Sequence, residues 1–361
     1  MIESGRTRQR RRPGPGRLVR LSPVILTVVI ASLAYSTPPE MAFSRLLPAA
    51  PALAASMWPV LPTVLLGTVC LLLMIGLSLV FPDLGTWWTA AGIIAVTVAA
   101  AYGSHLRLQR ERTLFQVRLV ADAAQQVVLS PMPRRFGNVE IESLYLAAAA
   151  EARIGGDFYE AADTPYGVRL LIGDVRGKGL PAVGAAAAIV NAFREAAYDE
   201  ADLVAVARRL DASSSRYNAA FPSDGVMERF ATALLVQIPH EGCRIDILNC
   251  GHPPPLLLHQ GDLHTLETAA PSPLLSLAEL IGDDYHVDTY DCAPGDLLLL
   301  YTDGVAETRA RDGEFFPLAS WMQRQPAMPP RELLSALHRD LLRYSRGRLD
   351  DDIAALAVLR R

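Results

Sequence analysis

The chain has 361 residues, of which 51% are hydrophobic and 20% are charged, and its net charge at neutral pH is −4. This length predicts more than one domain, and this composition excludes a disordered chain. The net charge excludes a polycationic nucleic-acid-binding protein, so no nucleic acid is expected as a partner. The charge is divided unevenly: residues 1–110 hold ten arginines and three acidic residues, a net of +7, and residues 111–361 hold the other 24 basic and 35 acidic residues, a net of −11.

The N-terminal third is apolar enough to lie in a membrane. Residues 18–36 are uncharged except for Arg20, and Asp83 is the only charged residue between positions 46 and 104. A bilayer span takes about 20 apolar residues, so the first stretch has room for one span and the second for about three. The second of these spans is the weakest prediction, because it is short and contains two prolines. The expected spans are 18–36, 43–58, 60–81 and 87–104.

The orientation of these spans follows from the basic residues that flank them. A cleaved signal peptide would also explain the first stretch, but not the long apolar segment behind it. The arginine cluster at residues 6–12 and the basic residues at 105–112 each favour the cytoplasmic side, so an even number of spans, four, is expected. Three spans with the N-terminus outside is the alternative. A basic cytoplasmic tail, residues 1–17, would then precede a multi-pass region, residues 18–104, in the cell membrane.

A connecting helix, assigned to residues 105–131, is expected between the membrane region and the remainder, residues 132–361. Its apolar residues recur at spacings of three and four up to a proline at 131, which is typical of a helical seam over two heptads. Two interpretations remain open: a helix that packs on the next domain, or a stalk that forms a homodimer and carries a signal. The seam residues are Leu114, Val117, Ala121, Ala124 and Val128.

Residues 132–361 read as a mixed α and β domain in a reducing compartment. No two cysteines have CxxC spacing, which excludes a zinc finger and argues against a disulfide framework. Short apolar runs predict buried strands, and Ala-rich periodic stretches predict helices, a count that fits two packed sheets with helices outside. The cysteines are Cys70, Cys243, Cys250 and Cys292. The expected strands are 139–148, 168–174, 231–238, 244–250, 254–258, 297–301 and 353–359, and the expected helices are 180–198, 201–216 and 331–345.

Four segments of this domain place aspartates at the ends of apolar runs. An Asp followed by Gly at a strand end is held in place while the chain turns away, and converging carboxylates repel one another unless a cation neutralises them. Oxygen ligands suit Mg²⁺ or Mn²⁺ rather than zinc, and two such ions can generate a hydroxide and bind a phosphate oxygen. One Asp-Gly alone usually marks only a turn. The segments are Gly-Gly-Asp-Phe-Tyr at 155–159, Gly-Asp-Val-Arg-Gly-Lys-Gly at 173–179, Tyr-Thr-Asp-Gly-Val at 301–305 and Asp-Asp-Asp-Ile at 350–353.

Together with Asn-Cys-Gly-His-Pro-Pro at 249–254, these motifs resemble, in order and spacing, the metal-dependent PPM protein phosphatases. The most similar branch is the bacterial sporulation stage II protein E-like (SpoIIE-like), sigma-regulatory group, over about residues 114–361. The resemblance implies an α+β fold of two stacked antiparallel β-sheets flanked by helices. It also implies a protein serine/threonine phosphatase whose substrate is a phosphorylated regulatory protein, such as an anti-sigma-factor antagonist. The nucleophile would be a hydroxide bound to two Mn²⁺ or Mg²⁺ ions, with no phosphoenzyme.

The resemblance implies a role for each aspartate. Asp174 would bridge both ions, and Asp157 would bind directly or through water. Asp352 is the alternative to Asp351 if the alignment shifts by one residue. The implied metal ligands are Asp157, Asp174, Val175 through its carbonyl, Asp303, Asp351 and Asp352, and the implied catalytic residues are Asp157, Asp174, Asp303 and Asp351.

The chain departs from the eukaryotic branch at one position. A histidine there follows the position of Val175 and is a candidate to protonate the leaving group, whereas here the residue is Arg176. We expect His252 to be structural within its proline-rich hairpin, and a bound water could be the acid. Arg153, Arg176 and Lys178 are weak candidates for contact with phosphate; for the arginines the alternative is a solvated side chain, and for Lys178 a role in shaping the glycine turn.

Three other interpretations compete with a phosphatase. The segment at 155–158 resembles the Gly-Gly-Asp-Glu-Phe loop of diguanylate cyclases, but the glutamate is missing. The glycines at 173–179 are too closely spaced for a P-loop, and no Ser or Thr follows the lysine. The alternative from another class is an inactive phosphatase fold that serves as a scaffold or signalling module. Such a scaffold would be expected to have lost metal ligands, and the motifs retain all of them.

Overall fold

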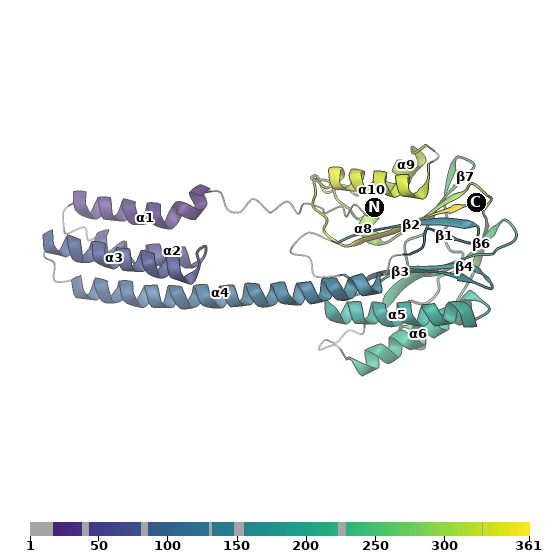
Figure 1. The fold of residues 1–361 in the computed structure, drawn as a ribbon, viewed down its shortest axis with the longest axis horizontal. Helices are drawn as coiled ribbons and strands as arrows, with labels where there is room; N and C mark the ends of the chain where they lie inside the picture. The colour runs from purple at the N-terminus through teal and green to yellow at the C-terminus, as the bar shows by residue number, and fades with distance from the viewer. Residues whose placement is uncertain are drawn as a thin grey trace, which may run out of the picture. The chain divides into compact units, whose positions relative to one another are not determined.

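The computed structural model describes residues 17–37, 43–80, 86–129, 132–147, 155–222, 229–282, 284–326 and 328–361. It divides into two units, Met1–Val117 and Arg118–Arg361, which are considered separately below (Figure 1). This division lies inside the helix α4, Thr86–Val128, which is continuous from the apolar region into the expected linker. The side chains of the five seam residues lie outside the described part of the chain, so packing or pairing through the seam stays a prediction, as do the domain limits.

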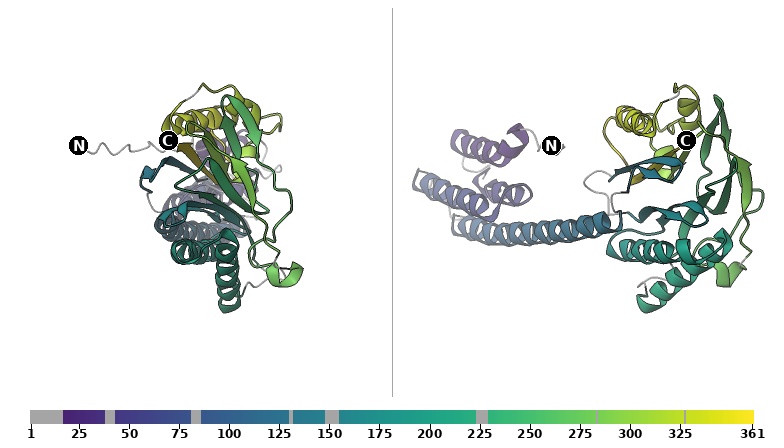
Figure 2. Two further views of the ribbon diagram at one scale, coloured as in Figure 1. Left: turned by 90° about the vertical axis from the view of Figure 1, so that its right-hand side faces the viewer. Right: turned by 45° about the vertical axis from the view of Figure 1, so that its right-hand side comes forward.

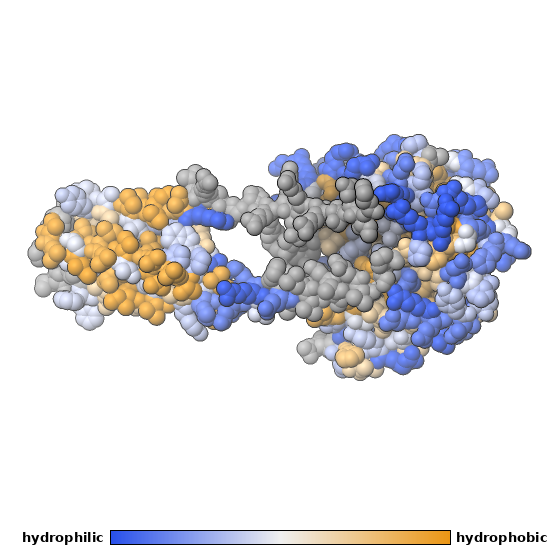
Figure 3. Space-filling model, in the orientation of Figure 1, coloured by the Kyte–Doolittle hydropathy of each residue, from blue (hydrophilic) through white to orange (hydrophobic). Residues whose placement is uncertain are grey.

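The N-terminal unit consists of apolar helices. Three of them, at Val19–Ser36, Val60–Val80 and Trp87–Thr113, are long and apolar enough to cross a membrane. Their outer surfaces carry exposed Val, Leu, Ile and Trp side chains, as the orange surface in Figure 3 shows. The helices are α1 (Arg17–Ser36), the short 3-10 helix η2 (Phe43–Leu46), α2 (Ala49–Ala55), α3 (Val60–Val80) and the first part of α4.

The expected span at 43–58 is wrong as a continuous helix. It forms η2 and the seven-residue α2, and seven helical residues extend only about 10 Å, a third of the hydrocarbon core. Pro48 and Pro51 interrupt it, because proline lacks an amide donor and clashes with the preceding turn. Ala50 and Ala54 are fully buried among the other helices.

Arg20 and Arg107, which border the first and last apolar helices, nevertheless lie at one end of this unit. The indole of Trp58 donates to the carbonyl oxygen of Arg20, near the start of α1, at 2.9 Å. The carbonyl of Trp58 accepts from Ser104 at 2.6 Å and from the Arg107 guanidinium at 3.0 Å, near the end of the apolar part of α4. The broken segment 43–58 therefore ends at the side where α1 starts, and the number of crossings stays a prediction.

The C-terminal unit contains two antiparallel sheets, which confirms the expected fold class (Figure 2). One sheet has the strand order β1-β2-β11-β10-β7-β8, and the other β3-β4-β5-β6-β9. The strands are β1 (Arg135–Phe136), β2 (Val139–Leu146), β3 (Asp157–Thr164), β4 (Gly167–Val175), β5 (Ala231–Ile238), β6 (Arg244–Cys250), β7 (Leu256–His259), β8 (Asp262–Thr265), β9 (Asp288–Asp291), β10 (Leu297–Tyr301) and β11 (Ile353–Arg360). The helices are α5 (Leu180–Asp199), α6 (Leu203–Ala220), α7 (Ala278–Ile281), α8 (Asp303–Ala306), α9 (Leu318–Gln323) and α10 (Pro330–Tyr344).

Three apolar layers hold this unit together. One, which includes Ile172 and Leu356, lies between the two sheets. A second fills the space between the five-stranded sheet and α5 and α6, and a third lies between the six-stranded sheet and α9 and α10. All seven expected strands and all three expected helices are present to within a few residues, whereas β1, β3, β8, β9 and the short helices α7, α8 and α9 were not expected. The alternation of apolar and polar residues was too short or too irregular there to indicate an element.

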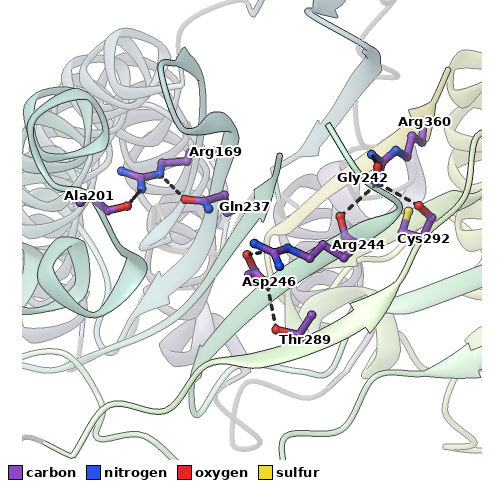
Figure 4. A network of polar contacts seen from close by, with 9 residues as sticks. All are labelled: Arg169, Ala201, Gln237, Gly242, Arg244, Asp246, Thr289, Cys292 and Arg360. Carbon is purple, nitrogen blue, oxygen red and sulfur yellow. Dashed lines mark hydrogen bonds and ion pairs between the residues drawn. The ribbon is translucent and has the colours of Figure 1, made fainter. Parts of the chain in front are cut away.

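Two buried arginines, Arg169 on β4 of the five-stranded sheet and Arg360 on β11 of the six-stranded sheet, bind backbone carbonyls of neighbouring segments (Figure 4). Arg169, which is fully buried, donates to Gln237 at 2.8 Å and to the carbonyl oxygens of Ala197, Glu200 and Ala201 at the end of α5. The guanidinium of Arg360 donates to the backbone carbonyl oxygens of Arg244, Cys292 and Gly242. A buried guanidinium is tolerated only when its donors are satisfied, so both arginines act as structural cross-links.

Replacing Arg169 with methionine should lower the free energy of unfolding by roughly 3 kcal/mol or more, because it leaves Gln237 and several carbonyls without a donor in the interior. The matched control is Arg209→Met, which removes an exposed ion pair with Glu200 and should change stability by less than about 1 kcal/mol. Thermal unfolding of the detergent-solubilised chain measures both. Equal effects of the two changes would contradict the assignment.

Candidate functional site

Two strand ends of the five-stranded sheet bring together the first pair of aspartates. Asp157 is the first residue of β3, and Asp174 is the last but one of β4. The antiparallel register pairs these two residues directly across the ladder. Directly opposed residues have their Cβ atoms only about 5 Å apart, so two carboxyl groups that share no charge partner meet at this edge.

The six-stranded sheet supplies the other aspartates in the same way. β10 ends at Tyr301, and Asp303 begins α8 two residues later. β11 begins at Ile353, directly after Asp351 and Asp352, and pairs with β10 so that Tyr301 faces Ala355. The end of one strand and the start of its neighbour therefore place these three aspartates at one edge.

Hydrogen bonds between the sheets join the two edges into one site. The Thr302 hydroxyl donates to Asp157 Oδ2 at 2.9 Å and accepts from the amide of Ala354 at 2.9 Å. The amide of Gly155 donates to Asp352 Oδ2 at 2.8 Å. The four expected aspartate segments, which are up to about 200 residues apart in sequence, therefore meet at one place.

Two glycines allow this close approach. A side chain at Gly155 would collide with the Asp352 carboxylate, and one at Gly304 would collide with the backbone carbonyl of Asp352. The group opposite Gly304 is a backbone carbonyl, which cannot move away by a change of rotamer. The glycines of the first and third motifs are therefore required by the packing of the two sheets at the site rather than by a left-handed backbone.

The aspartates raise one another's pKa values. Burial, and then the charge of Asp174, raise the pKa of Asp157 well above its ordinary value, although a hydrogen bond from Thr302 opposes this. Burial, and then Asp303, raise the pKa of Asp174 to about 7. Burial, and then Asp351, raise the pKa of Asp303, with Lys178 opposing. Desolvated like charges of this kind are stable together only when protonated or neutralised by a cation.

This donor set fits a hard divalent cation. All of the converging groups are carboxylates, which suit Mg²⁺ or Mn²⁺, and their mutual repulsion is what such an ion would relieve. Among the described residues, no three acidic, histidine or cysteine side chains already surround a common point as a complete ligand set. Asp351 instead lies 3.4 Å from Lys178 Nζ, and Asp352 is held by the groups described below. The carboxylates thus lie near one another, but their oxygens do not yet surround a single point as the ligands of a bound ion would.

The adjacent aspartates Asp351 and Asp352 have different environments. The Asp352 side chain is buried and accepts hydrogen bonds from the Tyr145 hydroxyl, at 2.7 Å, and from the Gly155 amide. The Asp351 side chain is half exposed, and its Oδ1 accepts from the amide of Asp352. Asp352 therefore holds Gly155, just before β3, and Asp351 is the more exposed carboxylate of the pair.

Tyr145, Thr302 and Gln125 support the site and were not singled out from the sequence. Burial raises the pKa of Tyr145, so its hydroxyl stays protonated and donates to Asp352. The same hydroxyl accepts from the side-chain amide of Gln125, on α4, at 2.6 Å. Thr302 lies inside an expected motif, whereas nothing in the local pattern around Tyr145 or Gln125 marks them.

His252 is structural, in agreement with the sequence-based expectation. It is buried, its ring Nδ1 lies 3.1 Å from the Thr232 hydroxyl, and its backbone is held by both side-chain atoms of Asn249. Burial lowers the pKa of His252 to about 3. The ring is therefore neutral at physiological pH and has no proton to give to a leaving group.

The three weak candidates for phosphate contact differ in what surrounds them. Arg153 lies outside the described residues. Arg176 is exposed and stacks on the ring of Phe230, with 5.0 Å between Cζ and the ring centroid. Lys178 faces Asp351 and, of the two candidates that the structure describes, is the one that lies against the aspartate cluster.

Comparison with known proteins relates this site to phosphatases. Residues 164–361 match the family model described as Stage II sporulation protein E (SpoIIE). The phosphoserine phosphatase RsbP of Bacillus subtilis (strain 168) is 28% identical over 176 residues, 48% of this chain and 41% of that protein. The phosphoserine phosphatase RsbU of the same strain is 22% identical over 276 residues, 74% of this chain and 77% of that one.

A solved structure supports the same fold. The RsbU and RsbW domains of Rv1364c from Mycobacterium tuberculosis superpose with a TM-score of 0.51 at 26% identity, over 63% of this chain and 61% of that one. The chain spans between 22% and 77% of the length of the curated relatives it matches. What those proteins do as wholes therefore bears on this chain only as a basis for proposals.

Replacing Asp174 with asparagine should stabilise the metal-free protein. Because the pKa of Asp174 is raised to about 7 on folding, the native state binds more protons than the unfolded state between about pH 4 and 7, and stability is lost as the pH rises through that window. Asp174→Asn should therefore raise the free energy of unfolding by about 1–3 kcal/mol at pH 8 and flatten this pH dependence.

The measurement is thermal unfolding of the detergent-solubilised chain in EDTA at pH 5 and pH 8. Asp163→Asn, at the far end of β3, is the matched control and should have little effect at either pH. A variant at position 174 that is less stable than wild type at pH 8 would refute the carboxylate repulsion.

Proposed function

The chain belongs to the stage II sporulation protein E (SpoIIE) family, and we propose that it is a membrane-anchored, metal-dependent protein serine/threonine phosphatase. One observation carries the proposal: aspartates from both sheets meet at one edge, where Thr302 and Gly155 join the sheets by hydrogen bonds to Asp157 and Asp352. A cluster of buried, mutually repelling carboxylates destabilises a fold unless it serves to bind cations.

The residues of the site would divide the work of phosphate hydrolysis. Two Mn²⁺ or Mg²⁺ ions would supply Lewis-acid stabilisation of the phosphate and a water of lowered pKa. Thr302 fixes one oxygen of Asp157, and Asp352 fixes the loop before β3. The proposed ligands are Asp157, Asp174, Asp303 and Asp351, with the carbonyl of Val175, and Asp352 is assigned to positioning.

The proposed substrate is phosphoserine or phosphothreonine on a regulatory protein of the anti-sigma-factor-antagonist type. The support is similarity to two phosphoserine phosphatases, RsbP and RsbU, and to a structure that contains an RsbU domain beside an RsbW domain. An inactive scaffold remains the alternative from another class. The retention of every motif aspartate, at one site, favours the enzyme.

The catalytic unit would face the cytoplasm. Arg107, Arg110 and Arg112 follow the apolar part of α4, and the contacts of Trp58 place Arg107 at the same end of the helical unit as Arg20. Basic residues flanking a span favour the cytoplasmic side. A homodimer through the linker helix is part of this proposal and rests on the seam of apolar residues alone.

Phosphate release from p-nitrophenyl phosphate tests the activity. The full chain in non-ionic detergent should show turnover that rises with added Mn²⁺, and Asp174→Asn should reduce kcat at least 100-fold, because a carboxylate proposed to hold the ions is lost. Asp163→Asn is the matched control and should retain wild-type turnover. Absence of both turnover and Mn²⁺ binding by calorimetry would instead establish the scaffold.

The linker helix should raise the activity of the catalytic unit. Gln125 is buried on α4 and donates to Tyr145, which in turn holds Asp352. Gln125→Leu should therefore lower kcat several-fold, the effect of losing about 1 kcal/mol of positioning. Gln116→Leu, at an exposed position of the same helix, is the matched control.

A fragment of residues 105–361 should likewise be more active than a fragment of residues 132–361, since only the longer one contains Gln125. Turnover of p-nitrophenyl phosphate with Mn²⁺ compares the four proteins. Equal rates for the two fragments, or for Gln125→Leu and its control, would show that the helix does not support the site.

A further inference from the structure

A basic cavity lies beside the aspartate cluster and is not used by the proposed reaction. Its volume is about 660 Å³, and it opens between the loop that follows α8 and the turn that follows α10. Its lining reaches Asp350, which is adjacent in sequence to the proposed metal ligand Asp351. The residues that matter here are Arg309, Arg311, Ser345, Arg346, Arg348 and Asp350.

The first wall of the cavity is an ordered hairpin. Arg309 and Phe315 form a β-bridge, and Ala310 and Glu314 are joined by a backbone hydrogen bond of 2.9 Å. The Arg309 guanidinium lies over the Phe315 ring, with 4.5 Å between Cζ and the ring centroid. This cation–π contact leaves the edge of the guanidinium, which carries its N–H donors, free to bind an anion.

The second wall is the turn that ends α10. Arg346 has a φ of 54°, in the left-handed region that favours glycine, and holding a non-glycine residue there costs about 1 kcal/mol or more. The neighbouring Gly347 is the residue whose amide returns to Leu342, at 2.7 Å. The side chain of Ser345 is more than nine-tenths buried, and within the described residues its hydroxyl has no hydrogen-bond partner. The left-handed Arg346 and the bond from Gly347 to Leu342 form the Schellman ending of α10, which fixes the positions of Arg346 and Arg348 on this wall.

The charge of the cavity is uncompensated. In the part of the chain that the structure describes, none of its four guanidinium groups makes a hydrogen bond or ion pair with another residue, whereas Arg169, Arg360 and Arg194 elsewhere in this unit are all engaged. One carboxylate, Asp350, faces the four arginines across the lining. Arginines bind carboxylates and phosphates through paired N–H donors, so this cavity is suited to a group with several negative charges.

We propose that this cavity binds an acidic segment of the phosphoprotein substrate, next to the phosphorylated residue. The inference rests on the proposed function, because the cavity adjoins the site of phosphate hydrolysis through Asp350 and Asp351. A chain that bound at the aspartate cluster could place neighbouring Asp or Glu side chains against the four arginines. The arginines would also offset the repulsion that an acidic substrate meets at a cluster of aspartates.

Two synthetic phosphoserine peptides that differ only in having glutamate or glutamine at the flanking positions test the proposal. The full chain in non-ionic detergent with Mn²⁺ should hydrolyse the glutamate peptide with the higher kcat/KM. Arg311→Gln combined with Arg348→Gln should reduce this preference about five-fold, mainly through KM, as the loss of two exposed ion pairs predicts. Turnover of p-nitrophenyl phosphate, which has no flanking residues, should be unchanged.

Matched variants separate charge from folding. Arg331→Gln combined with Arg339→Gln removes the same charge from exposed positions of α10 and should keep the preference. Arg346→Gly removes a guanidinium from the cavity and at the same time relieves the left-handed backbone, so it should weaken the preference without lowering Tm. A preference that survives in the cavity variants, or that is equally lost in the α10 control, would overturn the proposal.

Binding of a fluorescent, unphosphorylated glutamate peptide decides the matter independently of turnover. Its anisotropy should rise with added wild-type chain at low salt, and the Arg311→Gln, Arg348→Gln protein should bind several-fold more weakly. If p-nitrophenyl phosphate is not hydrolysed, the proposed function fails, but this measurement still tests the cavity. Unchanged peptide binding in the variant would refute the inference, as would arginine-dependent binding to phosphatidylserine vesicles in place of the peptide.

Discussion

Repulsion among carboxylates at the join between two sheets is the constraint on which the rest of this unit depends. Asp157 and Asp174 face each other across β3 and β4, and Asp303 approaches from β10, so that each raises the pKa of its neighbours. Such an arrangement persists only because the surrounding fold is stable without it. The apolar layers and the buried Arg169 supply that stability, and the site in turn would provide negative charge for the proposed cations.

The two sheets are joined at the site by uncharged or anchored groups rather than by the proposed ligands alone. Thr302 bridges Asp157 and the start of β11, and Asp352 ties the loop before β3 to Tyr145. The adjacent residues Asp351 and Asp352 differ in their surroundings. The Asp352 carboxylate is buried and accepts two hydrogen bonds, whereas the Asp351 side chain is half exposed. Because Tyr145 also receives a hydrogen bond from Gln125, the helix that leaves the apolar region takes part in holding the site.

The charges of the molecule are placed according to their surroundings. Arginines flank the apolar helices, where they would meet a membrane surface, and other arginines are buried as cross-links between loops and strands. Four more line a cavity beside an otherwise acidic site, and among the described residues their guanidinium groups make no hydrogen bond or ion pair. The proposed enzyme would thus hold cations with carboxylates and receive an acidic protein chain with arginines.

The sequence by itself determined seven of the strands, the main helices and the aspartates of the site, because apolar runs and Asp-Gly turns are local patterns, whereas it did not indicate β1, β3, β8 or β9. It also located the apolar region, although Pro48 and Pro51 break the segment that was expected to be a continuous span. Only the tertiary structure decided which aspartate is an anchor, since Tyr145 and Asp352 lie 207 positions apart. The burial that keeps His252 neutral, and the gathering of arginines around one cavity, likewise depend on contacts between distant segments, which no local pattern encodes.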